Sequence, residues 1–143
     1  MEIIELKSLT DAQTADLLAL MAELDGEIRV TADMLRAAAE SPVTHLFAVT
    51  DEAGRIVGCA SLCVFPSPTG LKASVEDVVV LSSCRGRHLG RALLEHILSF
   101  ARTELAPVEI HLTSRPHRVA ATALYLSLGF SRKETNVYIL KIA

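Results

Sequence analysis

Tryptophan is absent from this 143-residue sequence, and only two tyrosines and four phenylalanines are present. Because 50% of the residues are nevertheless hydrophobic, the core must consist mainly of leucine, valine, isoleucine and alanine, which suits a sheet covered by helices. The three cysteines are an odd number without C-x-x-C spacing, which implies neither a disulfide framework nor a zinc site. No segment reaches the roughly eighteen apolar residues of a membrane span, and a signal peptide is not evident. We therefore expect a cytoplasmic protein without a membrane partner.

Positive charge is also scarce. Fourteen lysines and arginines stand against seventeen aspartates and glutamates, giving a formal net charge of −3 and a sequence pI near 5.9. Nucleic-acid binding draws on a broad basic surface, whereas the basic residues here cluster only at 85–91 and 115–118. No two histidines have the i, i+4 spacing of H-E-x-x-H, so we expect no metal. This charge distribution predicts no nucleic-acid partner. A chain of this length is expected to form one domain, residues 1–143.

The most informative segment is a predicted strand followed by a turn and a helix. Valines are dense over Val75–Val80 and predict a strand, in which Glu76 and Asp77 interrupt the apolar pattern. From about Leu89 to Glu104, apolar residues recur at helical spacing with charged residues on the opposite side. Glu76 and Asp77 should therefore lie inside or beside a mostly buried strand.

The turn between these elements is basic and contains glycine. Main-chain N–H groups at a helix start face an anion, and three arginines add positive charge, so the turn is suited to a pyrophosphate. Gly86 and Gly90 are one residue too close for a Walker A loop, and the G-x-G-x-x-G fingerprint is absent, which excludes ATP hydrolysis and NAD binding. The candidate phosphate-binding residues are Arg85, Gly86, Arg87, His88, Leu89, Gly90 and Arg91.

A second informative segment begins about thirty residues later. Pro116 lies just before an alanine-rich helical stretch, and Gly129 is placed to adopt the left-handed conformation after the last turn of that helix. Phe130 would then begin a strand. Tyr125 lies within the helix, where on these residues alone it could be a core aromatic with a satisfied hydroxyl.

Both segments resemble signatures of the GNAT superfamily of acyl-CoA-dependent N-acyltransferases. Arg85 and Gly90 match the pattern [Q/R]-x-x-G-x-[G/A], although His88 stands at the first glycine. The second segment is similar to N-x-x-A-x-x-L-Y-x-x-x-G-F, with Arg118 in place of the asparagine. Its matching residues are Ala121, Leu124, Tyr125, Gly129 and Phe130. Because the two signature segments occur in the right order and at the right separation, the resemblance is specific.

The resemblance implies an α/β (mixed α+β) fold of GNAT type over nearly the whole chain. Its sheet would be mixed and mostly antiparallel, with a splayed parallel pair at the cofactor site and about four flanking helices. The remaining predicted elements are a strand at Ile3–Lys7, a helix from the Thr10 capping box to Asp25-Gly26, a helix from Thr31 to about Ala39, a hairpin of His45–Thr50 and Arg55–Phe65, and strands at Val108–Thr113, Phe130–Lys133 and Asn136–Ile142.

The implied reaction is direct transfer of the acetyl group of acetyl-CoA to a primary amine in a ternary complex. Glu76 is the candidate base, because an acid on a hydrophobic strand can have its pKa raised toward working pH, and the resemblance often assigns the base to this glutamate. The alternative is that Glu76 pairs with an arginine or caps the hairpin. Asp77 has the opposite strand parity and is the weaker candidate.

The resemblance also implies roles for the cofactor site. A main-chain N–H near Val78 would stabilise the oxyanion, and pantetheine would pair with the exposed main chain of Val78, Val79 and Val80. Tyr125 would supply the proton that the leaving thiolate needs. Arg118 is either a contact of the cofactor or substrate, or a solvated residue at a helix start. His88 could obstruct the diphosphate or, when protonated, contact it.

The sequence does not identify the acceptor amine, which can belong to a small molecule or to a peptide. Part of its pocket should lie around Leu24–Leu35. A catalytically silent acyl-CoA-binding sensor or interaction module is the main alternative, and a nucleotide-binding switch is a weaker one. Cys84 precedes two arginines and is a conceivable nucleophile, but no histidine is positioned as its base. A homodimer would use the Asn136–Ile142 edge, because an unpaired edge strand invites a partner.

Overall fold

The computed structural model describes residues 1–143, which divide into two compact units, Met1–Leu112 and Thr113–Ala143. The elements of the first unit are β1 (Glu2–Leu6), α1 (Asp11–Leu24), α2 (Ala32–Glu40), β2 (Thr44–Thr50), β3 (Ile56–Ser67), β4 (Gly70–Val80), the 3₁₀ turn η1 (Ser82–Cys84), α3 (Leu89–Phe100), the π-helical turn η2 (Ala101–Leu105) and β5 (Glu109–His111). The second unit contains α4 (Val119–Ser127). None of the helices has the length and apolar character required to cross a membrane.

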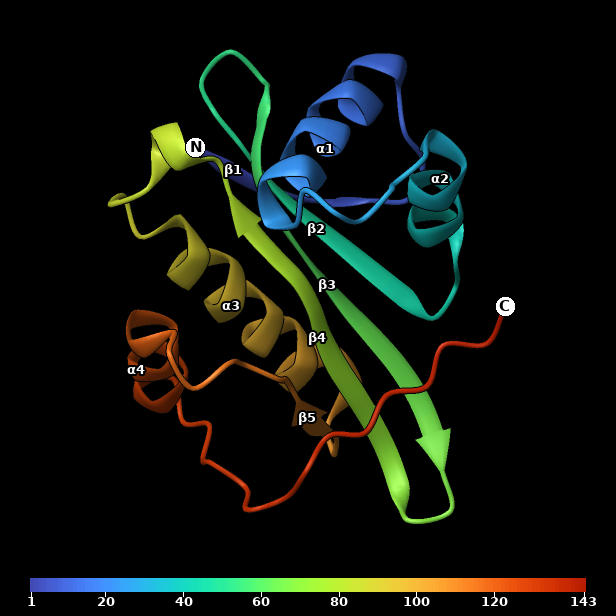
Figure 1. Ribbon diagram of the computed structural model, residues 1–143, viewed down its shortest axis with the longest axis vertical. Helices are drawn as coiled ribbons and strands as arrows, with labels where there is room; N and C mark the ends of the chain where they lie inside the picture. Colours follow the sequence, from blue (N-terminus) through green and yellow to red (C-terminus); the bar gives the residue numbers. More distant parts are fainter. The chain divides into compact units, whose positions relative to one another are not determined.

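The first unit is built on one mixed sheet with the strand order β1-β2-β3-β4-β5 (Figure 1). Neighbouring strands from β1 to β4 run antiparallel, whereas β4 and β5 run parallel. Parallel neighbours cannot be joined by a tight hairpin, and α3 provides the crossover between them. The predicted mixed, mostly antiparallel sheet with one parallel pair is thus confirmed.

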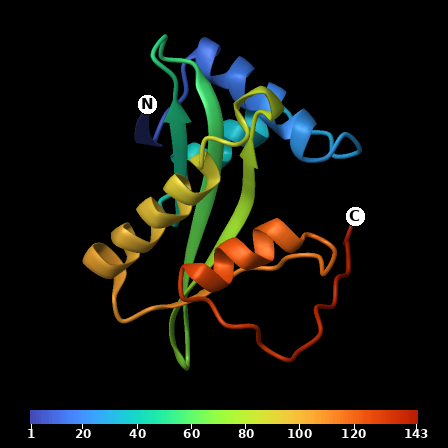
Figure 2. The same ribbon diagram turned by 90° about the vertical axis from the view of Figure 1, so that its left-hand side faces the viewer.

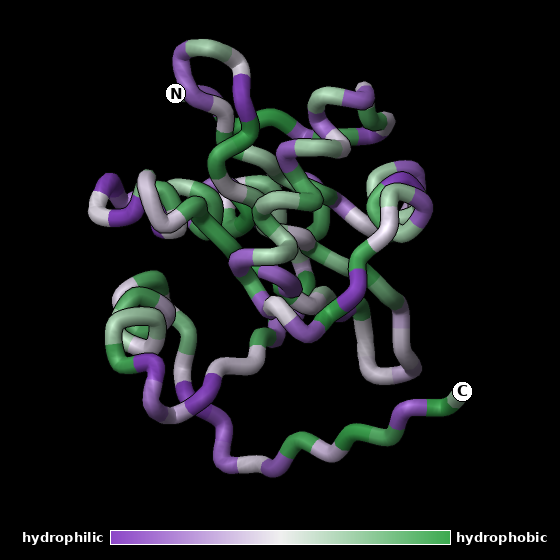
Figure 3. Tube along the Cα trace, turned by 45° about the horizontal axis from the view of Figure 1, so that its top comes forward, coloured by the Kyte–Doolittle hydropathy of each residue, from purple (hydrophilic) through white to green (hydrophobic).

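Helices cover both faces of this sheet, with α1 and α2 on one side and α3 on the other (Figure 2). The hydrophobic residues of the strands lie in the middle of this sandwich (Figure 3). Leu17 and Leu20 of α1 pack with Cys59 of β3 in one buried cluster. On the opposite face, Leu93 and Ile97 of α3 are fully buried. As the composition indicates, the core is aliphatic.

Short-range signals in the sequence place the early elements correctly. Gln13 N donates to Thr10 Oγ1 (3.1 Å), and Thr10 N donates to Gln13 Oε1 (2.9 Å), which is the predicted capping box. Thr31 caps α2 by accepting a hydrogen bond from Met34 N (3.2 Å). In the β2–β3 turn, Asp51 Oδ1 accepts from the main chain of residues 53 and 55. Capping and turn chemistry are local, so they can be read without knowing the fold.

Three boundaries in the first unit differ from the sequence prediction. β3 extends beyond the predicted Phe65 to Ser67, and β4 begins at Gly70 rather than at Val75, so a tight hairpin joins the two strands. The α-helix α3 ends at Phe100 and continues as the π-helical η2. β5 spans only Glu109–His111, which is shorter at both ends than the predicted strand Val108–Thr113.

The second unit contains the predicted tyrosine helix but not the predicted closing strands. Gly129 has φ 100° and donates to Leu126 O (3.1 Å), while Phe130 N donates to Tyr125 O (3.1 Å), which together form a Schellman cap. The predictions of strands at Phe130–Lys133 and Asn136–Ile142 are wrong, because neither a helix nor a strand follows α4. A strand needs a partner for its main-chain groups, and the second unit contains no strand to provide one.

Candidate active site

A β-bulge interrupts β4 at its two acids. Ser61 of β3 pairs with Glu76 and Cys59 pairs with Val79, so Asp77 and Val78 together stand opposite the single residue 60. Asp77 adopts the left-handed conformation with φ 53°, which aspartate tolerates better than most residues. The bulge leaves Val78 at a break in the β3–β4 ladder, where a main-chain group is freed from strand pairing.

Both acids of β4 act electrostatically on thiols of the neighbouring strand β3. Asp77 acts electrostatically on the thiols of Cys59 and Cys63, and Glu76 acts on Cys63. Cys59 belongs to the core beneath α1 and α2. Burial, with a smaller contribution from the Asp77 charge, raises the pKa of Cys59 to about 12. The prediction that Asp77 has the opposite strand parity to Glu76 assumes an unbroken strand, whereas β4 is interrupted by the bulge at this residue.

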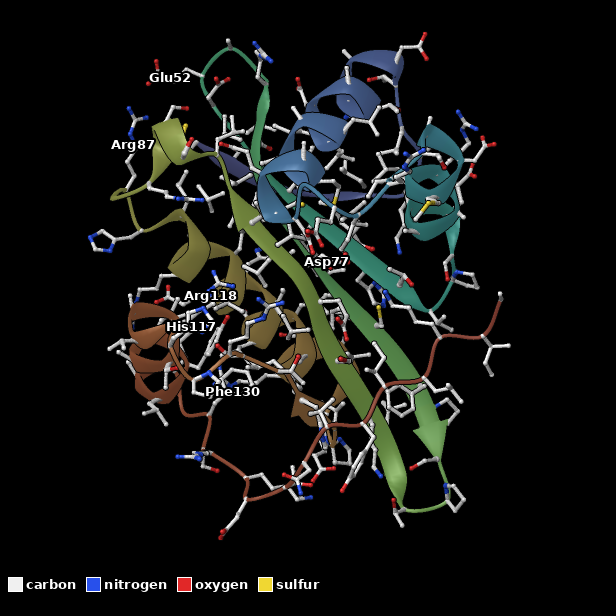
Figure 4. The ribbon with its side chains drawn as sticks, in the orientation of Figure 1. Glu52, Asp77, Arg87, His117, Arg118 and Phe130 are labelled. Carbon is white, nitrogen blue, oxygen red and sulfur yellow. The ribbon has the colours of Figure 1, made fainter.

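The two carboxylates have different surroundings. Ser74 Oγ donates a short hydrogen bond of 2.6 Å to Glu76 Oε1, and Glu76 makes no ion pair with an arginine. Asp77 lies near the middle of the sheet (Figure 4), where surrounding protein atoms remove part of the water from its carboxyl. This desolvation raises the pKa of Asp77 above its ordinary value, and the nearby charge of Glu76 raises it further. The surroundings of the Asp77 carboxyl thus favour its protonated form more than water does.

This shift predicts that Asp77→Asn stabilises the protein at neutral pH. A raised pKa in the folded state means that the native protein binds the proton more tightly than the unfolded chain, so the charged form costs stability above that pKa. Asparagine removes the charge and still tolerates the left-handed conformation. Urea unfolding at neutral pH should show a higher free energy of unfolding for the variant, and the gain should shrink at a pH low enough to protonate Asp77. An equal gain at every pH would contradict this cause.

Pairing between β4 and β5 stops just before the acids. The parallel ladder joins Lys72 to Glu109, residue 73 to residue 110, and Ser74 to His111, and it ends there. Within the first unit, the edge of β4 over Val78, Val79 and Val80 therefore has no strand beside it on the β5 side. The parallel pair that the resemblance implies is thus present, and its ladder leaves the β5 side of residues 78–80 without a strand partner in the first unit, a place where an extended ligand can pair.

His111 of β5 is paired in the strand register with Ser74, the residue that donates to Glu76. Its Nε2 lies 2.8 Å from Glu109 Oε2. Only the strand register reveals the pairing of Ser74 with His111, because the two residues are far apart in sequence. No group of three His, Cys, Asp or Glu side chains is arranged to hold a metal ion.

The loop after β4 presents main-chain donors at the start of α3. Gly86 (φ 83°) and His88 (φ 58°) are left-handed, and His88 is the N-cap residue but makes no side-chain capping bond. The first N–H groups of α3 therefore have no side-chain cap, which suits an anion. Because histidine is among the residues found in this conformation, His88 replaces a glycine without altering the turn.

The side chains of the loop differ in how readily a ligand could contact them. Arg87 extends into solvent from the loop (Figure 4), and Arg85 is also exposed. Arg91 instead forms an ion pair with Glu95, its Nε lying 2.7 Å from Oε1. Leu89 is buried in the core, so only its main chain is available to a ligand. Gly90 has open space where a Cβ would lie.

The other predicted site residues belong to the second unit. Tyr125 lies on α4 with its ring edge-on to Phe130 at a centroid distance of 6.2 Å. Arg118 is the N-cap residue of α4, and its main-chain O accepts from Thr122 Oγ1 (3.0 Å). In the first unit, the structure thus joins Glu76 to Ser74 by a hydrogen bond and pairs Ser74 with His111 in the strand register. In the second unit, Arg118 lies at the start of α4 and Tyr125 lies within that helix.

Comparison with known proteins gives concordant relatives. The profile of the Acetyltransferase (GNAT) family matches residues 7–130. The N-alpha-acetyltransferase RimI of Mycobacterium tuberculosis is 32% identical over 116 residues, covering 78% of this chain and 70% of the relative. A candidate acetyltransferase from Agrobacterium tumefaciens has a similar structure, with a TM-score of 0.84, 25% identity and coverage of 99% of this chain and 100% of the other.

A third similarity concerns the fold alone. The glucosamine-6-phosphate N-acetyltransferase of Arabidopsis thaliana superposes with a TM-score of 0.75 at 19% identity, covering 97% of both chains. The family profile spans most of the chain and includes both the loop before α3 and the tyrosine helix. The chain belongs to the Acetyltransferase (GNAT) family.

Proposed function

We propose that this protein is an N-acetyltransferase that transfers the acetyl group of acetyl-CoA directly to a primary amine. The observation that carries the proposal is the combination, on one strand–loop–helix segment, of a bulged strand with an open edge and an uncapped helix start. Residues 1–143 would act as one acetyltransferase domain, which is supported by a family match that spans both compact units.

The cofactor site would extend from the loop to the open edge of β4. Main-chain donors at the start of α3 would hold the diphosphate, with the exposed Arg85 and Arg87 adding positive charge. The pantetheine arm would then lie along the main chain of residues 78–80 in the manner of an added strand. The bound acetyl-CoA supplies a thioester whose carbonyl carbon the amine attacks. Arg118 is proposed as a further contact of the cofactor.

Proton transfer would be divided between named side chains. A protonated amine is not a nucleophile, so Glu76, with Asp77 beside it, would take the proton from the amine directly or through a water. The amine nitrogen forms the new bond to carbon, and the resulting oxyanion would be stabilised by the main-chain N–H near Val78. The C–S bond then breaks, and the Tyr125 hydroxyl would return a proton to the thiolate.

A protein amino terminus is the acceptor class that we propose to test first. The named activity of the 32% identical relative is that of an N-alpha-acetyltransferase. The acids Glu76 and Asp77 would also favour the approach of a positively charged amine before it is deprotonated. Three free thiols, at Cys59, Cys63 and Cys84, fit a reducing compartment, and we propose the cytoplasm.

The acceptor class is tested with three peptides that differ only in the state of the α-amine and in the presence of one lysine. The first has a free α-amine and no lysine, the second has a blocked α-amine and no lysine, and the third has a blocked α-amine and one lysine. We expect acetylation of the first peptide only, detected by mass spectrometry after incubation with acetyl-CoA. Acetylation of the lysine peptide at an equal rate would contradict a preference for amino termini while leaving the acetyltransferase activity established.

A further inference from the structure

Glu23 links the end of α1 to the turn that precedes the loop. Its Oε1 accepts a hydrogen bond of 2.6 Å from Ser82 Oγ, and both carboxylate oxygens lie 3.3 Å from Ser82 N. The two residues are 59 positions apart in the sequence. Glu23 adjoins the predicted acceptor region around Leu24–Leu35, whereas in the structure its carboxylate binds the turn that precedes the loop.

Ser82 is the residue that sets the position of this turn. It is the first residue of η1, and its carbonyl accepts a hydrogen bond from Arg85 N (3.4 Å). The first N–H of a helical turn has no partner inside that turn, and Glu23 provides one. Holding Ser82 therefore holds the main chain up to Arg85, immediately before the left-handed Gly86.

The surroundings of Glu23 also favour its charged form. The hydroxyl and the N–H of Ser82 lower the pKa of Glu23 below its ordinary value, slight desolvation opposes this, and the charge of Arg85 lowers it further. An ionised carboxylate thus stands near the first arginine of the loop.

We infer that Glu23 is a positioning residue for the cofactor, fixing Ser82 and Arg85 so that the loop is arranged to receive a diphosphate. This inference rests on the proposed function, in which the loop binds the diphosphate of acetyl-CoA. Glu23 acts through Ser82 and Arg85 and need not touch the ligand itself. Its removal should therefore weaken binding of the diphosphate part of the cofactor and leave binding of the pantetheine part unchanged.

The experiment compares binding of CoA with binding of pantetheine, which lacks the diphosphate and nucleotide. Dissociation constants are measured by calorimetry for the wild type, Glu23→Ala and Glu23→Gln. Loss of the preorganised turn should raise the Kd of CoA about tenfold in Glu23→Ala. Glu23→Gln, which keeps an oxygen for Ser82 Oγ but loses the charge near Arg85, should show a smaller rise. The Kd of pantetheine should stay the same in all three proteins.

Two further variants separate this role from general effects. Ser82→Ala removes the hydroxyl partner and should raise the Kd of CoA in the same direction as Glu23→Ala, with less than additive loss in the double variant. Glu40→Ala removes an exposed acid at the end of α2 and should leave the Kd of CoA unchanged. Thermal unfolding of each variant checks that the fold is intact.

The outcomes distinguish this inference from the proposed function. If the wild type binds CoA and Glu23→Ala binds it equally well, the positioning role is wrong and the proposed function stands. If CoA and pantetheine weaken by the same factor, Glu23 has only a structural role, which also overturns the inference. If the wild type binds no CoA at all, the proposed function fails and this inference fails with it.

Discussion

Glu76→Gln should lower kcat/KM for the amine by about 10²- to 10⁴-fold, the usual contribution of a positioned general base. The amide keeps the size of the side chain and can still accept the hydrogen bond from Ser74 Oγ, so the strand should be undisturbed. It can no longer take the proton from the amine. The measurement is the steady-state rate of acetyl transfer to a peptide with a free amino terminus, alongside thermal unfolding of both proteins.

Two companion variants make this prediction specific. Asp77→Asn should lower the rate by about tenfold or less if Asp77 only assists Glu76, and Ser74→Ala should have a smaller effect because it removes a hydrogen-bond donor to the base. A larger loss in Asp77→Asn than in Glu76→Gln would contradict the assignment and identify Asp77 as the base.

Gly90→Asp should abolish most acetyl-CoA binding without harming the fold. Gly90 is the second residue of α3, and nothing in the protein lies within 4 Å of the position of an added Cβ. An acid in the first turn of a helix is favourable by about 0.3–1 kcal/mol, so the free protein should keep or gain stability. A negative charge beside a bound diphosphate costs several kcal/mol, so the Kd of CoA should rise at least about 100-fold.

Gly90→Asn is the matched control, since it has the same size without the charge. We expect it to weaken CoA binding less than Gly90→Asp, and the difference between the two variants should shrink as salt is added. Binding is measured by calorimetry and stability by thermal unfolding. Equal CoA affinity in Gly90→Asp and wild type, with both folded, would show that the diphosphate does not lie at the start of α3.

The parts of the fold that the sequence predicts correctly depend on local chemistry. Thr10 and Gln13 form a capping box because both partners lie within one turn, and Gly129 ends α4 because few other residues adopt its φ. The apolar residues after α4 favour strands, but a strand also requires a partner strand. That requirement is not contained in the segment itself, which is why the prediction over 130–142 is wrong.

The candidate site also contains some features that the sequence predicts and others that it does not. The loop before α3 can be identified because glycines and arginines precede a helix start, and the left-handed His88 keeps that geometry. The bulge at Asp77 cannot be identified from the sequence, because one extra residue in a ladder leaves no periodic signal. It also reverses the strand parity of every residue beyond it. The contact between Glu23 and Ser82 and the register of His111 with Ser74 depend on tertiary structure.

The most direct test of the acetyltransferase proposal is the release of CoA thiol from acetyl-CoA by the wild-type protein, measured with and without a pool of amines that includes peptides with free amino termini. The proposal predicts release that requires the amine and that falls sharply in Tyr125→Phe, which removes the proposed proton donor and leaves the aromatic ring in place. If no amine pool causes release while acetyl-CoA still raises the melting temperature, the protein binds the cofactor without catalysis, which contradicts the acetyltransferase proposal in favour of a silent acyl-CoA-binding module.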